Sequence, residues 1–128
     1  MAKATIVKEF TFDAAHRLEG YQGLCQNLHG HTYKLQVGIY GPVKNEAGAA
    51  DDGMVWDFVK LKQAIKEKII DKLDHQYINE LVSFRPTSEN IALWMMKTLL
   101  AANIPVKFIR LYETPTSYVE IHEGDIGE

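Results

Sequence analysis

The strict alternation of residue types over residues 29–40 is the feature that most constrains the fold. Through residue 39, histidine, tyrosine and aliphatic side chains occupy one face of this segment, and glycine, threonine, lysine and glutamine occupy the other. A period of two is typical of a β-strand with one buried face, because successive side chains point to opposite sides. Residues 4–16 alternate in the same way. We therefore expect two strands that pair antiparallel through a glycine-containing loop at residues 17–28.

Two helices and two further strands are expected after this pair. Asp57 is placed to cap a helix whose apolar residues recur at helical spacing, and Thr87 is placed to cap a second helix that ends near residue 102. Residues 106–113 and 117–122 have the character of strands. The order β-β-α-α-β-β predicts an α+β fold, with a four-stranded antiparallel sheet and two helices on one of its faces.

Length and composition limit the class of protein. The chain has 128 residues, which predicts one domain over residues 1–128, and its 46% hydrophobic and 24% charged residues exclude a disordered chain. Its longest apolar run, residues 91–96, is far shorter than the roughly 20 residues of a membrane helix. The net charge of -3 argues against general affinity for nucleic acid. A single cysteine and a start without an apolar block favour a cytoplasmic protein without an internal disulfide.

Three histidines are predicted to converge at one end of the first two strands. His29 and His31 are two residues apart and share a face, and Gly30 leaves the opposite face bare at that point. His16 ends the preceding strand, so antiparallel pairing would bring it beside them. Three neutral imidazoles suit Zn²⁺ and leave its fourth position open, as in catalytic zinc sites. The alternative is that each histidine makes only ordinary hydrogen bonds.

Cys25 lies four residues before His29, in a polar loop flanked by glycine. A nearby metal would favour its thiolate, which can serve as a base or a nucleophile. Cys25 could instead be a fourth zinc ligand, or a buried and inert thiol. The sequence leaves these alternatives open.

Carboxylate and hydroxyl side chains at the ends of other elements are further candidates. In the pair Asp74-His75, the carboxylate can orient the imidazole and favour its protonated form. Glu113 ends the third strand, where a carboxylate can pair with two N–H groups of a pterin or guanine. The neighbours Thr87 and Ser88 most simply cap a helix. Each of these features also has an ordinary structural explanation, as a chance pair, a solvated carboxylate or a cap.

Taken together and in order, these motifs resemble the 6-pyruvoyl-tetrahydropterin synthase family. The resemblance covers essentially the whole chain, and its specific part is the Cys-x-x-x-His-Gly-His run joined to the upstream histidine. The segments concerned are Phe12-Asp13-Ala14-Ala15-His16, Cys25-Gln26-Asn27-Leu28-His29-Gly30-His31, Leu73-Asp74-His75, Pro86-Thr87-Ser88-Glu89-Asn90 and Glu113-Thr114.

The resemblance implies the T-fold, in which sheets of several subunits join around a tunnel. It implies a homo-oligomer, usually trimers stacked as hexamers, with active sites at subunit interfaces. Its zinc ligands fall on His16, His29 and His31, and its catalytic thiol falls on Cys25. Its Asp–His pair, expected from a neighbouring subunit, falls on Asp74 and His75. Its pterin-anchoring carboxylate falls on Glu113, and further substrate-binding positions fall on Thr87, Ser88 and Thr114.

The spacing of three residues between Cys25 and His29 resembles the branch of the family that forms 6-carboxy-5,6,7,8-tetrahydropterin for queuosine biosynthesis. This branch implies a zinc-dependent lyase that converts 7,8-dihydroneopterin triphosphate to that pterin, acetaldehyde and triphosphate. Arg17 and Lys34 are candidates for binding the triphosphate, or are ordinary surface residues. The alternatives are the biopterin-forming branch, a non-catalytic zinc- or pterin-binding T-fold protein, and another T-fold pterin enzyme such as a dihydroneopterin aldolase.

Overall fold

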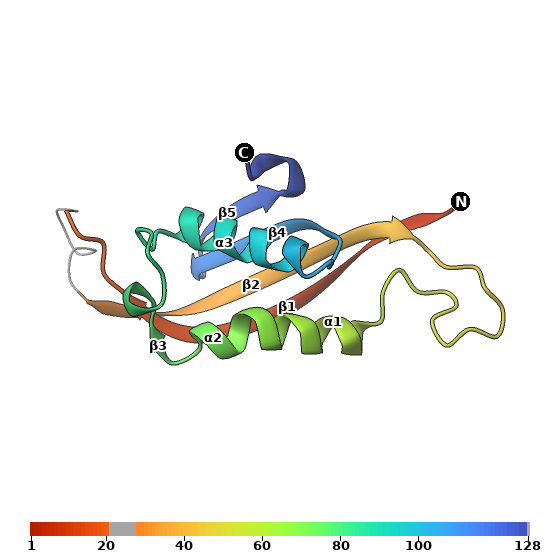
Figure 1. The fold of residues 1–128 in the computed structure, drawn as a ribbon, viewed down its shortest axis with the longest axis horizontal. Coiled ribbons are helices and arrows are strands. Elements are labelled where there is room, and N and C mark those ends of the chain that lie inside the picture. The colour runs from red at the N-terminus through yellow and green to blue at the C-terminus, as the bar shows by residue number, and fades with distance from the viewer. Residues whose placement is uncertain (21–27, 128) are drawn as a thin grey trace.

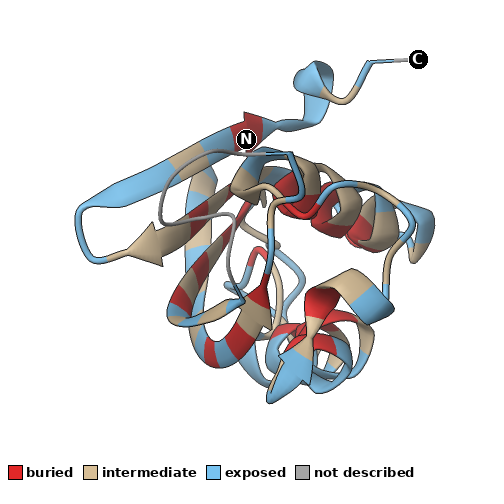
Figure 2. Ribbon diagram, turned by 90° about the vertical axis from the view of Figure 1, so that its left-hand side faces the viewer, coloured by how far each residue is buried: buried red, intermediate tan, exposed pale blue. Residues whose placement is uncertain are grey.

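The protein consists of a curved sheet with helices on one side (Figures 1 and 2). The structure is a computed structural model that describes residues 1–20 and 28–127. The strand order in the sheet is β3-β1-β2-β4-β5. The strands are β1 (Lys3–His16), β2 (His29–Pro42), β3 (Gln76–Tyr77), β4 (Val106–Thr114) and β5 (Ser117–His122). The helical segments are α1 (Phe58–Ile65), the π-helical turn η2 (Lys66–Ile70), α2 (Asp71–Leu73), η3 (Ile78–Glu80), α3 (Ser88–Ala101) and η4 (Glu123–Asp125).

The two long strands pair as the alternation predicts. β1 and β2 run antiparallel, from the pair Lys3–Pro42 at one end to the pair His16–His29 at the other. Their apolar faces look toward the helices, where Phe12 on β1 and Leu35 on β2 are almost fully buried. β2 continues through Pro42, two residues beyond the predicted end.

The first helical segment contains a π-turn that its apolar spacing explains. Leu61, Ile65, Ile69 and Leu73 recur every four residues and are at most 1% exposed. An α-helix has 3.6 residues per turn, so a repeat of four would rotate steadily away from the core. The wider turn of η2, between α1 and α2, brings the later residues back to the same side. Asp57 caps the segment, because its side chain accepts a hydrogen bond from the Val59 backbone N–H.

Helix α3 begins and ends where the sequence predicts. The Thr87 side chain accepts a hydrogen bond from the Asn90 backbone N–H, which satisfies one free donor at the start of the helix. Asn103 follows the helix with a φ of 63°, a left-handed conformation that Asn tolerates better than most residues. The helix packs against β4 and β5. No helix of the described residues is long and apolar enough to span a bilayer.

The α+β fold with helices on one face of the sheet is confirmed. Over the described residues, however, the sheet is mixed and has five strands, which corrects the predicted four-stranded antiparallel sheet. The short strand β3 lies parallel to β1 and pairs Gln76 with Ala14 and Tyr77 with Ala15. A strand of two residues is too short to show the alternation by which strands are detected in a sequence. β3 matters for the site because it holds the end of the first helical segment against the edge of β1.

Candidate metal centre

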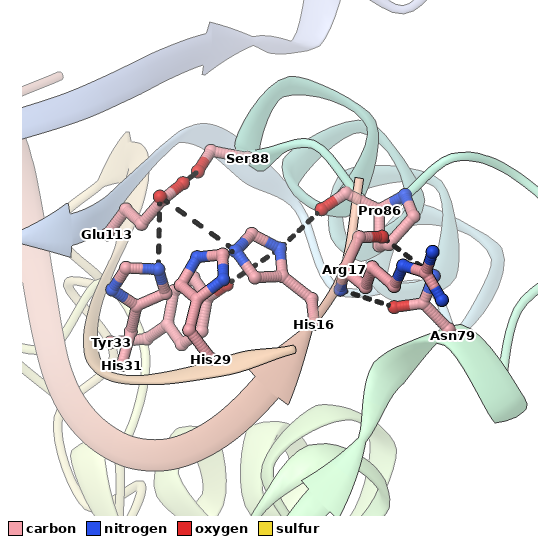
Figure 3. A network of polar contacts seen from close by, with 9 residues as sticks. All are labelled: His16, Arg17, His29, His31, Tyr33, Asn79, Pro86, Ser88 and Glu113. Atoms are coloured by element: carbon pink, nitrogen blue, oxygen red, sulfur yellow. Dashed lines mark hydrogen bonds and ion pairs between the residues drawn. The ribbon is translucent and has the colours of Figure 1, made fainter. Parts of the chain in front are cut away.

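The three predicted histidines meet at the end of the β1–β2 pair (Figure 3). His16 is paired directly with His29, and His31 is paired with Ala14, which lies two residues before His16 on the same face. The ring centroids are 4.7 Å apart for His16 and His29, 5.1 Å for His16 and His31, and 4.6 Å for His29 and His31. Strand alternation and antiparallel register therefore produce this convergence.

Glu113, from the end of β4, joins the three histidines. Its Oε1 lies 3.2 Å from His31 Nε2 and 3.9 Å from His16 Nε2. One ligand atom from each of the four residues lies within 4.8 Å of all the others. We name the set of His16, His29, His31 and Glu113 the metal cluster. The sequence predicted a substrate-binding role for Glu113 but not this position, which follows from the pairing of β2 with β4.

A backbone carbonyl orients His16 toward the centre of the cluster. The His16 side chain is completely buried, and its Nδ1 lies 2.8 Å from the Pro86 carbonyl oxygen. A carbonyl oxygen only accepts, so Nδ1 carries the proton and Nε2 keeps a free lone pair. That Nε2 lies 3.1 Å from His29 Nε2. Metal-binding histidines are usually fixed in this way through the nitrogen that does not ligate.

His31 offers a buried nitrogen that no hydrogen bond satisfies. Among the described residues, its Nε2 has no partner of acceptable hydrogen-bond geometry, although Glu113 Oε1 is 3.2 Å away. Burial is the main influence on His31 and lowers its pKa, and His16 and His29 lower it further. The Glu113 carboxylate raises the pKa but does not outweigh burial. His31 is therefore mainly neutral at pH 7, as a metal ligand must be.

Zinc fits this set of donors. Ligands at about 2.0–2.1 Å from a tetrahedral ion are roughly 3.3 Å from one another. The His16–His29 and His31–Glu113 separations of 3.1 Å and 3.2 Å are close to that spacing. Imidazole nitrogen and carboxylate oxygen are both common zinc ligands. The unsatisfied nitrogen of His31 is a further sign that the cluster is built to hold a cation.

Ser88 and Thr87 connect the start of α3 to the metal cluster. The Ser88 hydroxyl donates a short hydrogen bond to Glu113 Oε2, the carboxylate oxygen that faces away from the histidines. Thr87 is occupied in capping the helix, as the simpler interpretation of the sequence predicted. Thr114 lines a cavity of about 480 Å³ together with His31 and Glu113.

Tyr33 closes the inner side of the cluster. Its ring is fully buried, and its hydroxyl lies 3.5 Å from His16 Nδ1. Burial, with a smaller contribution from the Glu113 charge, raises the pKa of Tyr33, so the phenol stays neutral. The side chain that packs against the inner side of the metal cluster is therefore uncharged.

Asp74 and His75 belong to a second cluster, built around Asp13. Asp74 Oδ1 accepts a hydrogen bond of 3.0 Å from the Asp13 backbone N–H and lies 3.1 Å from His75 Nδ1. The backbone hydrogen bond is the main cause that lowers the pKa of Asp74; burial opposes it, and His75 reinforces it. His75 has a φ of 60°, a costly conformation for a non-glycine residue, and its N–H donates to the Asp13 carbonyl at 2.6 Å. This anchoring fixes the pair at the sheet edge.

The two clusters lie on different sides of the sheet. Asp13 and Thr32, whose side chains are hydrogen-bonded at 2.6 Å, alternate with the residues of the helix-covered face and so point away from the helices. They line a cavity of about 500 Å³ together with His75, and His31 of the metal cluster lines the same cavity. The described residues of one chain therefore do not bring Asp74 and His75 to the centre of the metal cluster.

The predicted site residues that remain are the catalytic thiol and the two candidates for binding the triphosphate. Cys25 lies outside the described residues. The backbone N–H and C=O of Arg17 both bond the Asn79 side chain, each at 2.8 Å, and Arg17 lines a cavity of about 390 Å³ with Arg85. Lys34 lies over the Tyr112 ring, 4.2 Å from its centroid. Two arginines thus line a cavity near His16. Lys34 lies on the opposite face of the sheet from His16, but it lines the cavity that His31, Glu113 and Thr114 share.

Comparison with known proteins relates the whole chain to one family. Residues 5–124 match the family described as 6-pyruvoyl tetrahydropterin synthase. A 6-carboxy-5,6,7,8-tetrahydropterin synthase of Haemophilus influenzae is 42% identical over 92% of this chain and 98% of its own. A dihydroneopterin monophosphate aldolase of Pyrococcus furiosus is 34% identical over 93% of this chain and 97% of its own. The structure of Caenorhabditis elegans 6-pyruvoyl tetrahydropterin synthase superposes with a TM-score of 0.81 and 29% sequence identity. The superposition covers 95% of this chain and 96% of the other.

Proposed function

Because this chain belongs to the 6-pyruvoyl tetrahydropterin synthase family, we propose that it is a 6-carboxy-5,6,7,8-tetrahydropterin synthase. The proposed reaction consumes 7,8-dihydroneopterin triphosphate and water, and it releases the carboxypterin, acetaldehyde and triphosphate. The product would serve the 7-deazaguanine and queuosine pathway. The relative of 42% identity and nearly full coverage carries that name, which supports this branch over the others.

The metal cluster is the single observation that carries the catalytic part of this proposal. His16, His29 and His31 would hold Zn²⁺, because their nitrogens converge and the buried His31 Nε2 lacks a hydrogen-bond partner among the described residues. Bound zinc would supply Lewis-acid chemistry to the hydroxyl groups of the substrate side chain. The carbonyl of Pro86 would keep His16 in the tautomer that ligates.

The protein's own side chains would move the protons. Asp74 is ionised at neutral pH, since its pKa is lowered, and it would hold the Nδ1–H of His75. His75 Nε2 could then accept and return a proton, as in other carboxylate–imidazole pairs. Cys25 is proposed as the thiolate that takes a proton from the substrate side chain. Glu113, Thr87, Ser88 and Thr114 are proposed to bind the pterin.

The placement of the two clusters supports the proposal of a homo-oligomer with shared active sites. The cluster of Asp13, Asp74 and His75 lies on the side of the sheet away from the helices, and the metal cluster gathers on the other face, although His31 lines the same cavity as His75. We propose that His75 and Asp74 of one subunit serve the metal cluster of another, in an oligomer of trimers or hexamers. A cytoplasmic location remains part of the proposal.

Product analysis tests the function directly. Zinc-loaded protein is incubated with 7,8-dihydroneopterin triphosphate, and the products are identified by mass. We expect 6-carboxytetrahydropterin and acetaldehyde, with turnover lost in Cys25→Ala and after removal of zinc. A 6-pyruvoyl product would place the protein in the biopterin branch, and side-chain cleavage without a new carboxyl group would indicate an aldolase. Zinc binding without turnover of this substrate would contradict the proposed activity.

A further inference from the structure

We propose that Glu113 is the fourth metal ligand of the substrate-free protein, and that pterin binding displaces it. This inference rests on the proposed function for the identity of the displacing ligand. The three-histidine site predicted from the sequence leaves one coordination position open. In the structure, a carboxylate oxygen lies where a fourth ligand would be.

The position of Glu113 Oε1 supports direct ligation. It lies 3.2 Å from His31 Nε2, without the geometry of a hydrogen bond, and 3.9 Å from His16 Nε2. Two atoms bound to one zinc ion need no hydrogen between them, and roughly 3.3 Å is the spacing expected for neighbouring tetrahedral ligands. Among the described residues that form the metal cluster, the carboxylate is the one negatively charged group, so it would offset part of the charge of the cation.

Ser88 holds the carboxylate in the ligating orientation. Its hydroxyl donates to Glu113 Oε2, which leaves Oε1 directed at the imidazoles. Ser88 is the first residue of α3, and the cap formed by Thr87 fixes the backbone at that point. Hydrogen bonds to ligating carboxylates are a regular part of metal sites. Ser88 is therefore a positioning residue for the metal.

Both oxygens of Glu113 already have partners, because Oε1 is directed at the metal position and Oε2 accepts from Ser88. A pterin that binds to Glu113 must therefore compete with these partners. The amino-pyrimidinone edge of a pterin presents two N–H groups, and a bidentate pair with a carboxylate uses both oxygens. Binding the pterin in this way would withdraw Oε1 from the histidines and Oε2 from Ser88. The fourth position would then open only when substrate is present to occupy it.

Zinc affinity tests the ligation without any turnover. Competition with a chromogenic chelator is measured for the full-length wild type, Glu113→Gln, Ser88→Ala and the control Glu89→Gln, which removes an exposed carboxylate next to Ser88. We expect the affinity to fall about 100-fold in Glu113→Gln and about 10-fold in Ser88→Ala, and to be unchanged in the control. Wild-type affinity in a folded Glu113→Gln protein would overturn the proposal.

Cobalt spectroscopy identifies the fourth ligand and its displacement. The visible spectra of the Co²⁺-substituted wild type and Glu113→Gln should differ, because water or the Gln amide would replace the carboxylate as the fourth ligand. Addition of 7,8-dihydroneopterin should change the wild-type spectrum but not that of Glu113→Gln. A sulfur-to-cobalt charge-transfer band that disappears in Cys25→Ala and persists in Glu113→Gln would assign the position to Cys25 and overturn the proposal. An unchanged wild-type spectrum would rule out displacement.

These measurements separate the inference from the proposed function. The affinities and the cobalt spectrum of the substrate-free protein do not depend on which pterin is converted. Loss of zinc affinity in Glu113→Gln would support ligation even if the carboxypterin product were never observed. Carboxypterin formation with an unaltered affinity in Glu113→Gln would leave the function intact and exclude Glu113 as a ligand.

Discussion

At the scale of single residues, a few backbone contacts determine what each ionisable side chain can do. The Pro86 carbonyl selects the tautomer of His16, and the Asp13 N–H holds Asp74 in its ionised form. Neither contact involves residues that are neighbours in the sequence. The types of residue identify candidates for chemistry, whereas these contacts determine which atoms are free to bind a metal or to transfer a proton.

The lowered pKa of Asp74 predicts a pH-dependent contribution to stability. The folded state favours the ionised carboxylate, so this contribution is present above the ordinary pKa of 3.8 and is lost as the pH falls through the folded value. We expect Asp74→Asn to lower the free energy of unfolding at pH 7, and by less at pH 3. Urea unfolding at one fixed protein concentration measures both differences.

Asp71→Asn is the matched control for this prediction. Asp71 lies three residues earlier and pairs with Lys66 at 2.8 Å on the exposed surface, where ion pairs contribute little. Its effect on the free energy of unfolding should be small at both pH values. A loss in Asp74→Asn that is equal at pH 7 and pH 3 would contradict the role of the ionised carboxylate.

At the scale of elements, the pairing of β2 with β4 carries Glu113 to the histidines, and Gly38 makes that pairing possible. The register between the two strands shifts between Gly38 and Ile39. The Phe108 ring of β4 covers Gly38 so closely that an added Cβ would overlap it. Arg110 holds the outer side of this ring, with its guanidinium carbon 5.0 Å from the ring centroid.

Gly38→Ala should therefore destabilise the protein through its contact with Phe108. We expect a loss of about 1–3 kcal/mol in the free energy of unfolding, because the ring has to move from its place over the strand. In a Phe108→Ala background, the same change should cost much less. A double-mutant cycle by chemical denaturation measures the coupling. Equal costs in the two backgrounds would show that the backbone at Gly38, and not the ring, is the source of the loss.

At the scale of the whole molecule, one chain holds the two clusters on different faces of its sheet. Mixed oligomers test whether subunits share sites. His31→Ala should be inactive because it disrupts the metal cluster. His75→Ala should be inactive because it disrupts the Asp74–His75 pair. After denaturation and joint refolding in equal amounts, about a quarter of the sites should combine two intact clusters and regain turnover.

The controls for this experiment are each variant refolded alone, and the two variants mixed without denaturation. All three should remain inactive. Product formation is measured as for the wild type. If the jointly refolded sample also remained inactive while forming oligomers of normal size, the active site would be contained within one subunit.

Much of the fold could be predicted from the sequence because its signals are local. Alternation over residues 29–40 sets the two faces of β2, and Asp57 and Thr87 cap their helices as predicted. The short strand β3 was missed because a two-residue strand has no periodicity and depends on the neighbouring edge of β1. The spacing of four in the first helix is visible in the sequence, but the π-turn is a response to the core on which the helix packs.

The sequence by itself determined the three histidines and their convergence, since alternation and antiparallel pairing leave little choice of where their side chains point. Only the tertiary structure decided that Glu113 lies among them and that Asp74 and His75 lie on the other side of the sheet. The physical reason is that strand faces follow from local periodicity, whereas the register of β2 with β4 and the docking of β3 depend on packing between distant segments.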